Sequence, residues 1–241
     1  MKAIILAAGR GSRMKDLTDA VPKCLVRLRG VTLLDRQLSA LHAAGITDIA
    51  IVTGYRRELL AQQGLVEFHN PRWAKTNMVS SLACAQAWLD EGSCIVSYSD
   101  IFYDASGVRS LIESTAALAI TYDANWRSLW EKRFGDPLLD AETFRMDANH
   151  RVVEIGNKPR TLADVEGQYM GLLRITPAGW REFECIRDDL SADDRDQMHM
   201  TGTLQRVVDA GRVPVLAIPY VGDWGEVDSA DDLAAYCQHR S

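Results

Sequence analysis

The chain lacks the features that would connect it to nucleic acid or to a metal–thiolate site. Its 241 residues include 27 basic and 33 acidic side chains, for a net charge of −6, and no basic tail or run. A nucleic-acid polymer would need a positive stripe, so none is expected as a partner, and any affinity for phosphate must be local. The cysteines are odd in number and form no Cys-x-x-Cys pair, which predicts neither a disulfide framework nor a zinc site but reduced, mostly buried thiols. They are Cys24, Cys84, Cys94, Cys185 and Cys237.

Long apolar runs are missing too. The opening stretch, Met1 to Ala8, is too short and too soon followed by Arg10 to be a signal peptide. No other run approaches the length needed to cross a bilayer. We therefore expect a cytoplasmic protein with no membrane partner.

Common nucleotide-binding and nucleophile motifs are also absent. A dinucleotide fingerprint would need a small residue where the chain has Met14, and its acidic partner would be Asp35, which lies in a helical pattern. No glycine is followed by lysine and a hydroxyl residue, as a P-loop requires. No Ser/His/Asp or Cys/His arrangement indicates a covalent nucleophile. The sequence predicts neither a Rossmann NAD site nor a Walker-type NTPase.

What the chain does contain is a glycine-rich, cationic loop directly after its first apolar run. Residues 3–8 are too few for a helix and end at a glycine, which predicts a buried strand. Gly9 and Gly11 lack a Cβ, so their backbone amides can approach a ligand closely. Such a loop suits a polyphosphate. The cations that follow are Arg10, Arg13, Lys15 and Lys23.

This stretch resembles the signature of the nucleotidyltransferase family that makes sugar nucleotides and CDP-alcohols. The pattern LAAGxGxRMxxLTxxxPK is matched without exception at Leu6, Ala7, Ala8, Gly9, Gly11, Arg13, Met14, Leu17, Thr18, Pro22 and Lys23. The resemblance implies that residues 6–11 and Arg13 grip a nucleoside triphosphate. It also implies that Lys23 lies against the α-phosphate and the incoming phosphate, so Arg13 and Lys23 are candidate catalytic residues.

Strand and helix patterns alternate along the chain. Residues 33–44 have one apolar helical face, and 48–54 and 94–98 are buried strands. Alternation predicts a mostly parallel sheet, and the length fits one domain over 1–241. We expect an α/β fold, a Rossmann-like three-layer sandwich, with a small inserted substrate-binding region at 123–175.

Within that inserted region the alternation stops. Residues 123–137 have a loop-like pattern, whereas 143–147 and 151–155 are typical of a hairpin. We expect this region to be a substrate lid or a small subdomain.

Nucleotidyl transfer brings two anions together, because an acceptor oxygen attacks the α-phosphorus while pyrophosphate leaves. Mg²⁺ lowers that repulsion and commonly uses one or two carboxylates. By resemblance to bacterial choline-phosphate cytidylyltransferases, Asp100 at a strand end, Glu226 and Asp228 are the expected ligands, with Asp100 also catalytic. If extended, residues 226–228 place both carboxylates on one face and Val227 in the core. Residues 229–232 also form a capping-box pattern, which gives Asp228 an alternative, structural interpretation.

Residues 76–82 resemble the Asn…Ser-Leu element of choline-phosphate cytidylyltransferases rather than the Gly-Thr-Ala helix start of sugar pyrophosphorylases. The resemblance implies cytosine as the base. Thr76, Asn77 and Ser81 offer groups that read a pyrimidine edge. The alternative is an ordinary helix with an N-cap.

The acceptor phosphate is assigned by a further resemblance. Residues 156–159 are similar to the Glu-Lys-Pro element of the sugar enzymes, whose lysine contacts that phosphate, which points to Lys158. Asn157 replaces the glutamate that holds sugar hydroxyls, and this argues against a sugar acceptor.

The rest of the acceptor leaves two chemistries open. Trp126, Trp130 and Tyr169 would hold a quaternary ammonium by cation–π attraction. A primary ammonium would instead need oxygen acceptors such as Asp123 and Asp136. These aromatics would equally suit ordinary core packing.

Together these patterns predict a Mg²⁺-dependent cytidylyltransferase that moves CMP from CTP to phosphocholine or 2-aminoethylphosphonate and releases pyrophosphate. One alternative is a sugar-1-phosphate uridylyl- or thymidylyltransferase. Another is a nucleotide-binding protein without catalysis. His199, Met200 and Thr201 are possible neighbours of the acceptor, although a lone histidine is more often structural.

Overall fold

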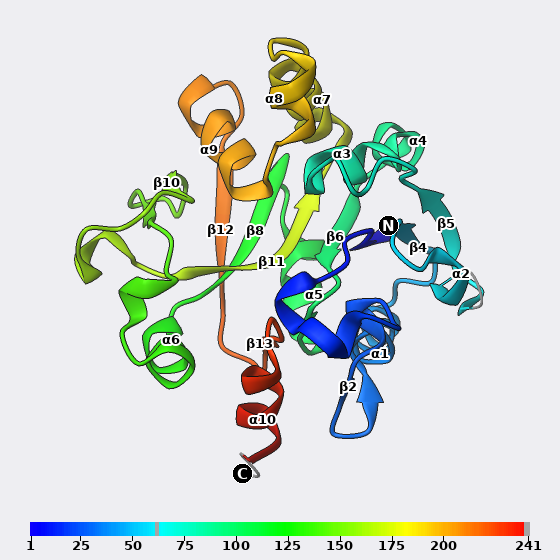
Figure 1. The fold of residues 1–241 in the computed structure, drawn as a ribbon. Coiled ribbons are helices and arrows are strands. Elements are labelled where there is room, and N and C mark those ends of the chain that lie inside the picture. The colour runs from blue at the N-terminus through cyan, green and yellow to red at the C-terminus, as the bar shows by residue number, and fades with distance from the viewer. Residues whose placement is uncertain (61–62, 239–241) are drawn as a thin grey trace.

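The computed structural model describes residues 1–60 and 63–238, and it is built around one central sheet (Figure 1). β11 runs antiparallel to both of its neighbours, and the other pairs in this sheet are parallel. The predicted mostly parallel sheet is confirmed. The strands are, in order across the sheet, β12 (Val215–Tyr220), β8 (Leu118–Asp123), β11 (Gln168–Ile175), β6 (Cys94–Tyr98), β1 (Lys2–Ala7), β4 (Ile49–Thr53) and β5 (Val66–His69).

Helices cover both faces of this sheet, which gives the predicted three layers. The alternation along β1 shows how: Ile4 and Leu6 pack in the core beneath α3, α4, α7 and α9, whereas Ala3 and Ile5 pack in the core beneath α1 and α5. The helices are α1 (Leu33–Ala43), α2 (Arg57–Leu60), α3 (Met78–Ala83), α4 (Gln86–Glu91), α5 (Ala105–Glu113), α6 (Trp126–Phe134), α7 (Pro177–Asp188), α8 (Ala192–Asp196), α9 (Met200–Ala210) and α10 (Ala230–Gln238).

Short elements complete the fold around the end of β1. Two 3₁₀ turns, Ser12–Thr18 and Lys23–Leu25, form the loop after β1. Two small antiparallel pairs follow, one of β2 (Arg27–Leu28) with β3 (Val31–Thr32) and one of β7 (Ile101–Phe102) with β13 (Gly225–Glu226).

The chain leaves the central sheet between β8 and β11. The predicted hairpin is present as β9 (Phe144–Met146) and β10 (Val152–Ile155). The prediction of a loop at 123–137 was wrong, because Trp126–Phe134 forms the helix α6. Its aromatics recur at every fourth position, so Trp126, Trp130 and Phe134 share one face, and Trp130 packs on Trp224 with ring centroids 6.2 Å apart.

The cysteines only partly follow the expected pattern. Cys24 and Cys94 are buried, Cys84 is partly buried and Cys185 is exposed, and all four are free thiols. Cys237 has no described side chain. Within the described ranges, no helix is both long enough and apolar enough to cross a bilayer.

Candidate active site

The loop after β1 folds back so that Lys23 crosses Gly11. Gly11 has φ +69°, and a Cβ added there would lie 3.0 Å from Cδ of Lys23. A larger residue would therefore be strained both by its backbone and by the lysine. This explains why the chain has glycine where the lysine enters the site.

The ammonium of Lys23 lies between two carboxylates that are far apart in the sequence. It donates to Oδ2 of Asp100 at 2.7 Å and to Oδ1 of Asp228, while Arg13 Nη1 lies 3.0 Å from the other oxygen of Asp228. Burial opposes the charge on Lys23, but the two carboxylates outweigh burial and raise its pKa. Lys23 is therefore a buried, fully charged ammonium at neutral pH.

The pairing of β7 with β13 brings the carboxylates together. Ile101 pairs with Glu226, and the amide of Val227 donates to the carbonyl of Asp100 at 2.9 Å. Val227 is fully buried. The strand itself ends at Glu226, but Glu226 and Asp228 both lie beside Asp100 while Val227 fills the core, as a period of two predicts.

These three acids form a compact cluster. Oxygen atoms of Asp100, Glu226 and Asp228 all lie within 4.8 Å of one another. Burial, followed by the charges of Asp228 and Asp100, raises the pKa of Glu226. Burial opposes ionisation of Asp228 as well, but the charge and hydrogen bond of Lys23 lower its pKa. The capping box is also present, because Ser229 and Asp232 exchange hydrogen bonds, so Asp228 both leads into α10 and belongs to the cluster.

Arg133, a residue that the sequence did not single out, supports the cluster from α6. Its side chain is 2% exposed, with Nη1 3.3 Å from Glu226 and Nε 2.8 Å from Asp232. Burial opposes the charge on Arg133, yet Asp232 and Glu226 raise its pKa. Arg133 thus connects Glu226 of the cluster to Asp232 of α10.

Replacing Arg133 by leucine should lower the free energy of unfolding by about 3 kcal/mol, because Asp232 and Glu226 would lose their buried partner. Urea unfolding measures this loss. Arg127→Leu, on the same helix, breaks only an exposed pair with Glu131 and should cost less than about 1 kcal/mol. Equal losses in the two variants would contradict a supporting role for Arg133.

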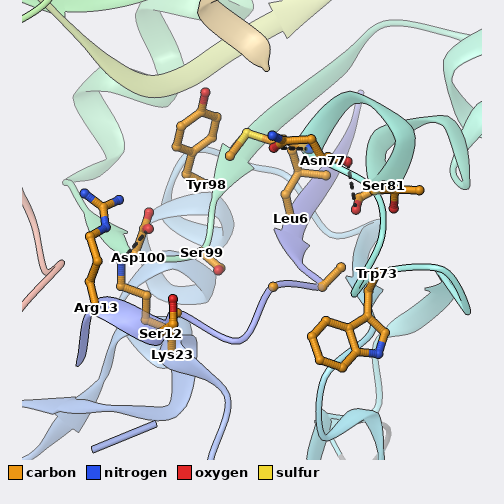
Figure 2. Close-up of a pocket in the computed structure, with 15 residues that line it drawn as sticks. Leu6, Ser12, Arg13, Lys23, Trp73, Asn77, Ser81, Tyr98, Ser99 and Asp100 are labelled. Atoms are coloured by element: carbon orange, nitrogen blue, oxygen red, sulfur yellow. Dashed lines mark hydrogen bonds and ion pairs between the residues drawn. The ribbon is translucent and has the colours of Figure 1, made fainter. Parts of the chain in front are cut away.

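One pocket opens beside the cluster, with a volume of about 300 Å³, and Figure 2 shows its wall. Arg13, Lys23 and Asp100 lie on one side, and Asn77 and Ser81 lie across from them. The sequence-predicted nucleotide residues that line it are Leu6, Ala8, Gly9, Gly11, Thr76, Asn77 and Ser81. Ala7 does not, because its side chain turns into the core on the other face of the sheet.

The helix at the far wall of this pocket is held by its own polar residues. Asn77 caps α3 by accepting from the amide of Met78 at 2.7 Å. Asn70 donates to Thr76 at 2.9 Å and to Ser81 at 3.0 Å, which fixes both hydroxyls. The N-cap interpretation is therefore correct for Asn77, and the same residue still faces the pocket. Trp73, Met78, Tyr98 and Ser99 line the pocket too, although no sequence pattern identified them.

A second pocket, of about 440 Å³, adjoins the first on the other side of the carboxylates. The two share Arg13, Asn77, Met78 and Tyr98 as common walls. Glu226 and Asp228 line the second pocket, and Asp100 lines the first. The cluster therefore lies where the contents of the two pockets would meet.

The comparisons with known proteins identify the family. Residues 3–164 match the model of the MobA-like NTP transferase domain. The chain belongs to this family. It is a nucleotidyltransferase, as the loop signature implied.

Related proteins of this nucleotidyltransferase include several cytidylyltransferases. CTP:phosphoglutamine cytidylyltransferase of Campylobacter jejuni is 36% identical over 249 residues, which cover 97% of this chain and 98% of that protein. Choline-phosphate cytidylyltransferase of Haemophilus influenzae is 37% identical over 105 residues, which cover 42% of this chain and 44% of that protein.

A solved structure confirms the fold of the transferase. It is that of the inositol-1-phosphate CTP transferase from T. maritima, with a TM-score of 0.75 and 20% identity, and the match covers 98% of this chain and 93% of that one.

The predicted acceptor residues of the transferase are divided between the second pocket and other parts of the fold. Trp130 and Tyr169 line that pocket. Trp126 is 4% exposed and packs in the core, and Asp123 accepts from the indole of Trp224 at 3.0 Å. The ammonium of Lys158 donates to the carbonyls of Leu138 and Leu139, the latter at 3.0 Å, and it lines neither pocket. Asp136 caps the turn at Pro137–Leu139.

The second pocket is lined instead by polar residues other than Asp123, Asp136 and Lys158. Glu142, Gln168, His199 and Thr201 line it. His199 also contacts Asn77 through Nδ1 at 2.8 Å, so this histidine connects the two pockets. His199, Met200 and Thr201, which the sequence indicated as neighbours of the acceptor, all line the second pocket, whereas no sequence pattern pointed to Glu142.

Proposed function

We propose that the protein transfers CMP from CTP to a small phosphorylated acceptor and releases pyrophosphate. The observation that carries the proposal is the meeting of two pockets at Lys23, Arg13 and three carboxylates. Support for CTP comes from the full-length similarity to a CTP-dependent relative and from the polar wall formed by Asn77 and Ser81. The nucleotide would occupy the pocket beside the glycine loop, with the acceptor in the adjoining one.

Each charged residue has a distinct part in this reaction. Arg13 is 69% exposed at the mouth of both pockets, a position suited to the outer phosphates of the triphosphate. Lys23 is buried at the boundary, where negative charge develops as the acceptor oxygen attacks the α-phosphorus. The acceptor phosphate supplies the nucleophile directly, so no protein nucleophile is required.

The carboxylates fit a magnesium ion. All three ligands offer oxygen, and Oδ1 of Asp100 is buried without a hydrogen-bond partner among the described residues. Asp100, Glu226 and Asp228 would hold the ion, which would neutralise charge on the phosphates. Because Lys23 is bonded to two of these acids, a bound cation would leave its ammonium free for phosphate.

The acceptor should carry polar groups rather than a quaternary ammonium. Trp126 and Trp130 are each 4% exposed, so they form no open aromatic box. Glu142 and His199, whose side chains carry oxygen and nitrogen, instead line the acceptor pocket, together with Thr201. Phosphoglutamine, the acceptor named for the full-length relative, fits this chemistry, as does 2-aminoethylphosphonate, and phosphocholine fits it less well.

The test is pyrophosphate release with Mg²⁺, measured for CTP, UTP, dTTP and ATP with each acceptor in turn. We expect release with CTP and with phosphoglutamine or 2-aminoethylphosphonate, at kcat/KM at least about tenfold above phosphocholine, the equivalent of one buried polar contact. Glucose-1-phosphate is the control for a sugar acceptor. Release with UTP or dTTP and the sugar phosphate would overturn the assignment of both base and acceptor, and release with no pair would support nucleotide binding without catalysis.

A further inference from the structure

A third cavity, of about 440 Å³, lies outside the two pockets of the proposed active site. It is bounded by α7, by α8 and by the α3–α4 turn, which lie together in Figure 1. Ala83 and Gln86 face it from the α3–α4 side, whereas Asn77 and Ser81, earlier on the same helical segment, face the nucleotide pocket. α3 therefore separates this cavity from the active site.

Two arginines in this cavity lack a charged partner. Arg187 and Arg195 both line it, and no described carboxylate lies within ion-pair distance of either guanidinium. Arg187 makes one long contact, 3.5 Å to the hydroxyl of Ser80, and Arg195 one of 3.4 Å to the carbonyl of Leu190. Nε of Arg195 is buried and unpartnered. Burial, followed by the charge of Arg195, lowers the pKa of Arg187. Each guanidinium could therefore donate hydrogen bonds to the oxygens of a phosphate or carboxylate group.

The nearby acids offset the charge of this pair only in part, because Asp188 and Asp196 raise the pKa of Arg187 by less than burial and Arg195 lower it. Glu184 is engaged by Gln86, whose amide donates to it at 2.8 Å. Asp188 is exposed at the end of α7, and Arg181 adds a further exposed positive charge. With three arginines and two acids among its described lining residues, the cavity is net positive.

The segment that carries Arg195 is hydrogen-bonded to the start of α3. The amide of Asn77 donates to the carbonyl of Asp196 at 2.6 Å, and that of Val79 donates to Met198 at 3.4 Å. The hydroxyl of Ser80 donates to the carbonyl of Arg195 at 3.2 Å. His199, four residues after Arg195, contacts the side chain of Asn77 and lines the acceptor pocket. A ligand that fixes Arg195 would thus fix the backbone on which both pockets depend.

We propose that Arg187 and Arg195 bind a small phosphate-bearing anion in this cavity, and that this anion is an effector of the transferase. It bridges α7 and α8 and holds residues 195–199 against α3. Nucleotide binding then costs less ordering of Asn77, so the anion lowers the KM for the nucleotide. This site is separate from the proposed active site, and its failure would leave the proposed function standing.

Titration of the full chain with inorganic phosphate at constant ionic strength, followed by ³¹P line broadening, tests the site. Saturable binding should weaken about tenfold or more in Arg187→Gln and in Arg195→Gln, because each removes a charged hydrogen bond. Arg187→Lys keeps the positive charge but loses the two-pronged guanidinium, so its affinity for phosphate should lie between that of these two variants and that of the wild type. Arg127→Gln, an exposed arginine on α6, is the matched control and should bind as the wild type does.

The kinetic arm uses the same variants. Phosphate should lower the KM for the nucleotide about fivefold in the wild type and Arg127→Gln, and not in Arg187→Gln. Melting curves establish that each variant is folded. Binding that survives in both arginine variants and is displaced by excess nucleotide would place phosphate at the catalytic loop and overturn the proposal, as would the absence of saturable binding.

Discussion

Replacing Lys23 by alanine is expected to lower turnover by about a hundredfold or more, the usual loss when a charge donor is removed from a transition state. The ammonium lies 2.7 Å from Asp100 and is also bonded to Asp228, at the point where the two pockets meet. The two described arginines beside it are already engaged, since Arg13 is bonded to the other oxygen of Asp228 and Arg133 is bonded to Asp232. Initial rates of pyrophosphate release at saturating substrates measure the effect.

Two measurements separate catalysis from folding in this variant. Lys23→Ala removes a competitor for Asp100 and Asp228, so it should bind Mn²⁺ as well as or better than the wild type, by paramagnetic relaxation. Lys132→Ala, an exposed lysine on α6, serves as the surface control and should keep full turnover. Near-normal turnover in Lys23→Ala, with the fold intact, would refute the role of Lys23.

The part of the site that the sequence predicts is local in the chain or follows from strand order. Residues 6–23 are contiguous, so their motif carries both the strand and the loop that follows. Asp100 lies two residues after the end of β6, and β6 pairs with β1. The order of the strands therefore places Asp100 beside the glycine loop. The period of two in 226–228 predicted the direction of both carboxylates, and the pairing of β7 with β13 agrees.

The missing part depends on packing between segments that are distant in the sequence. Arg133 reaches the cluster only because α6 packs beside α10, and the sequence predicted a loop for this segment. For its aromatics the sequence left an ammonium box and core packing open, and Trp126 and Trp130 are both buried. Glu142 and His199 line the same pocket although they lie 57 residues apart in the sequence, and no local pattern links them. Lys158 was assigned from a short motif alone, and in the structure its ammonium donates to the carbonyls of Leu138 and Leu139.

Conversion of Asp228 to asparagine should lower both turnover and metal affinity by about a hundredfold, since the change removes a charged ligand without changing its shape. Asp100→Asn should act in the same way, because its buried Oδ1 has no hydrogen-bond partner among the described residues. Mn²⁺ binding in the absence of nucleotide gives a readout that does not depend on activity. Asp231→Asn, an exposed acid at the start of α10, is the matched control and should leave affinity and turnover unchanged.

The two kinds of variant also distinguish a metal site from a lysine anchor. If the carboxylates served only to position Lys23, the aspartate variants would lose turnover but bind Mn²⁺ as the wild type does, and added Mg²⁺ would not restore any of the lost rate. If they hold the ion, raising Mg²⁺ should recover part of the rate in Asp228→Asn, because mass action offsets the weaker site. Lys23→Ala, which keeps all three acids, should show no such recovery, and this contrast assigns the acids to the metal and the lysine to the phosphate.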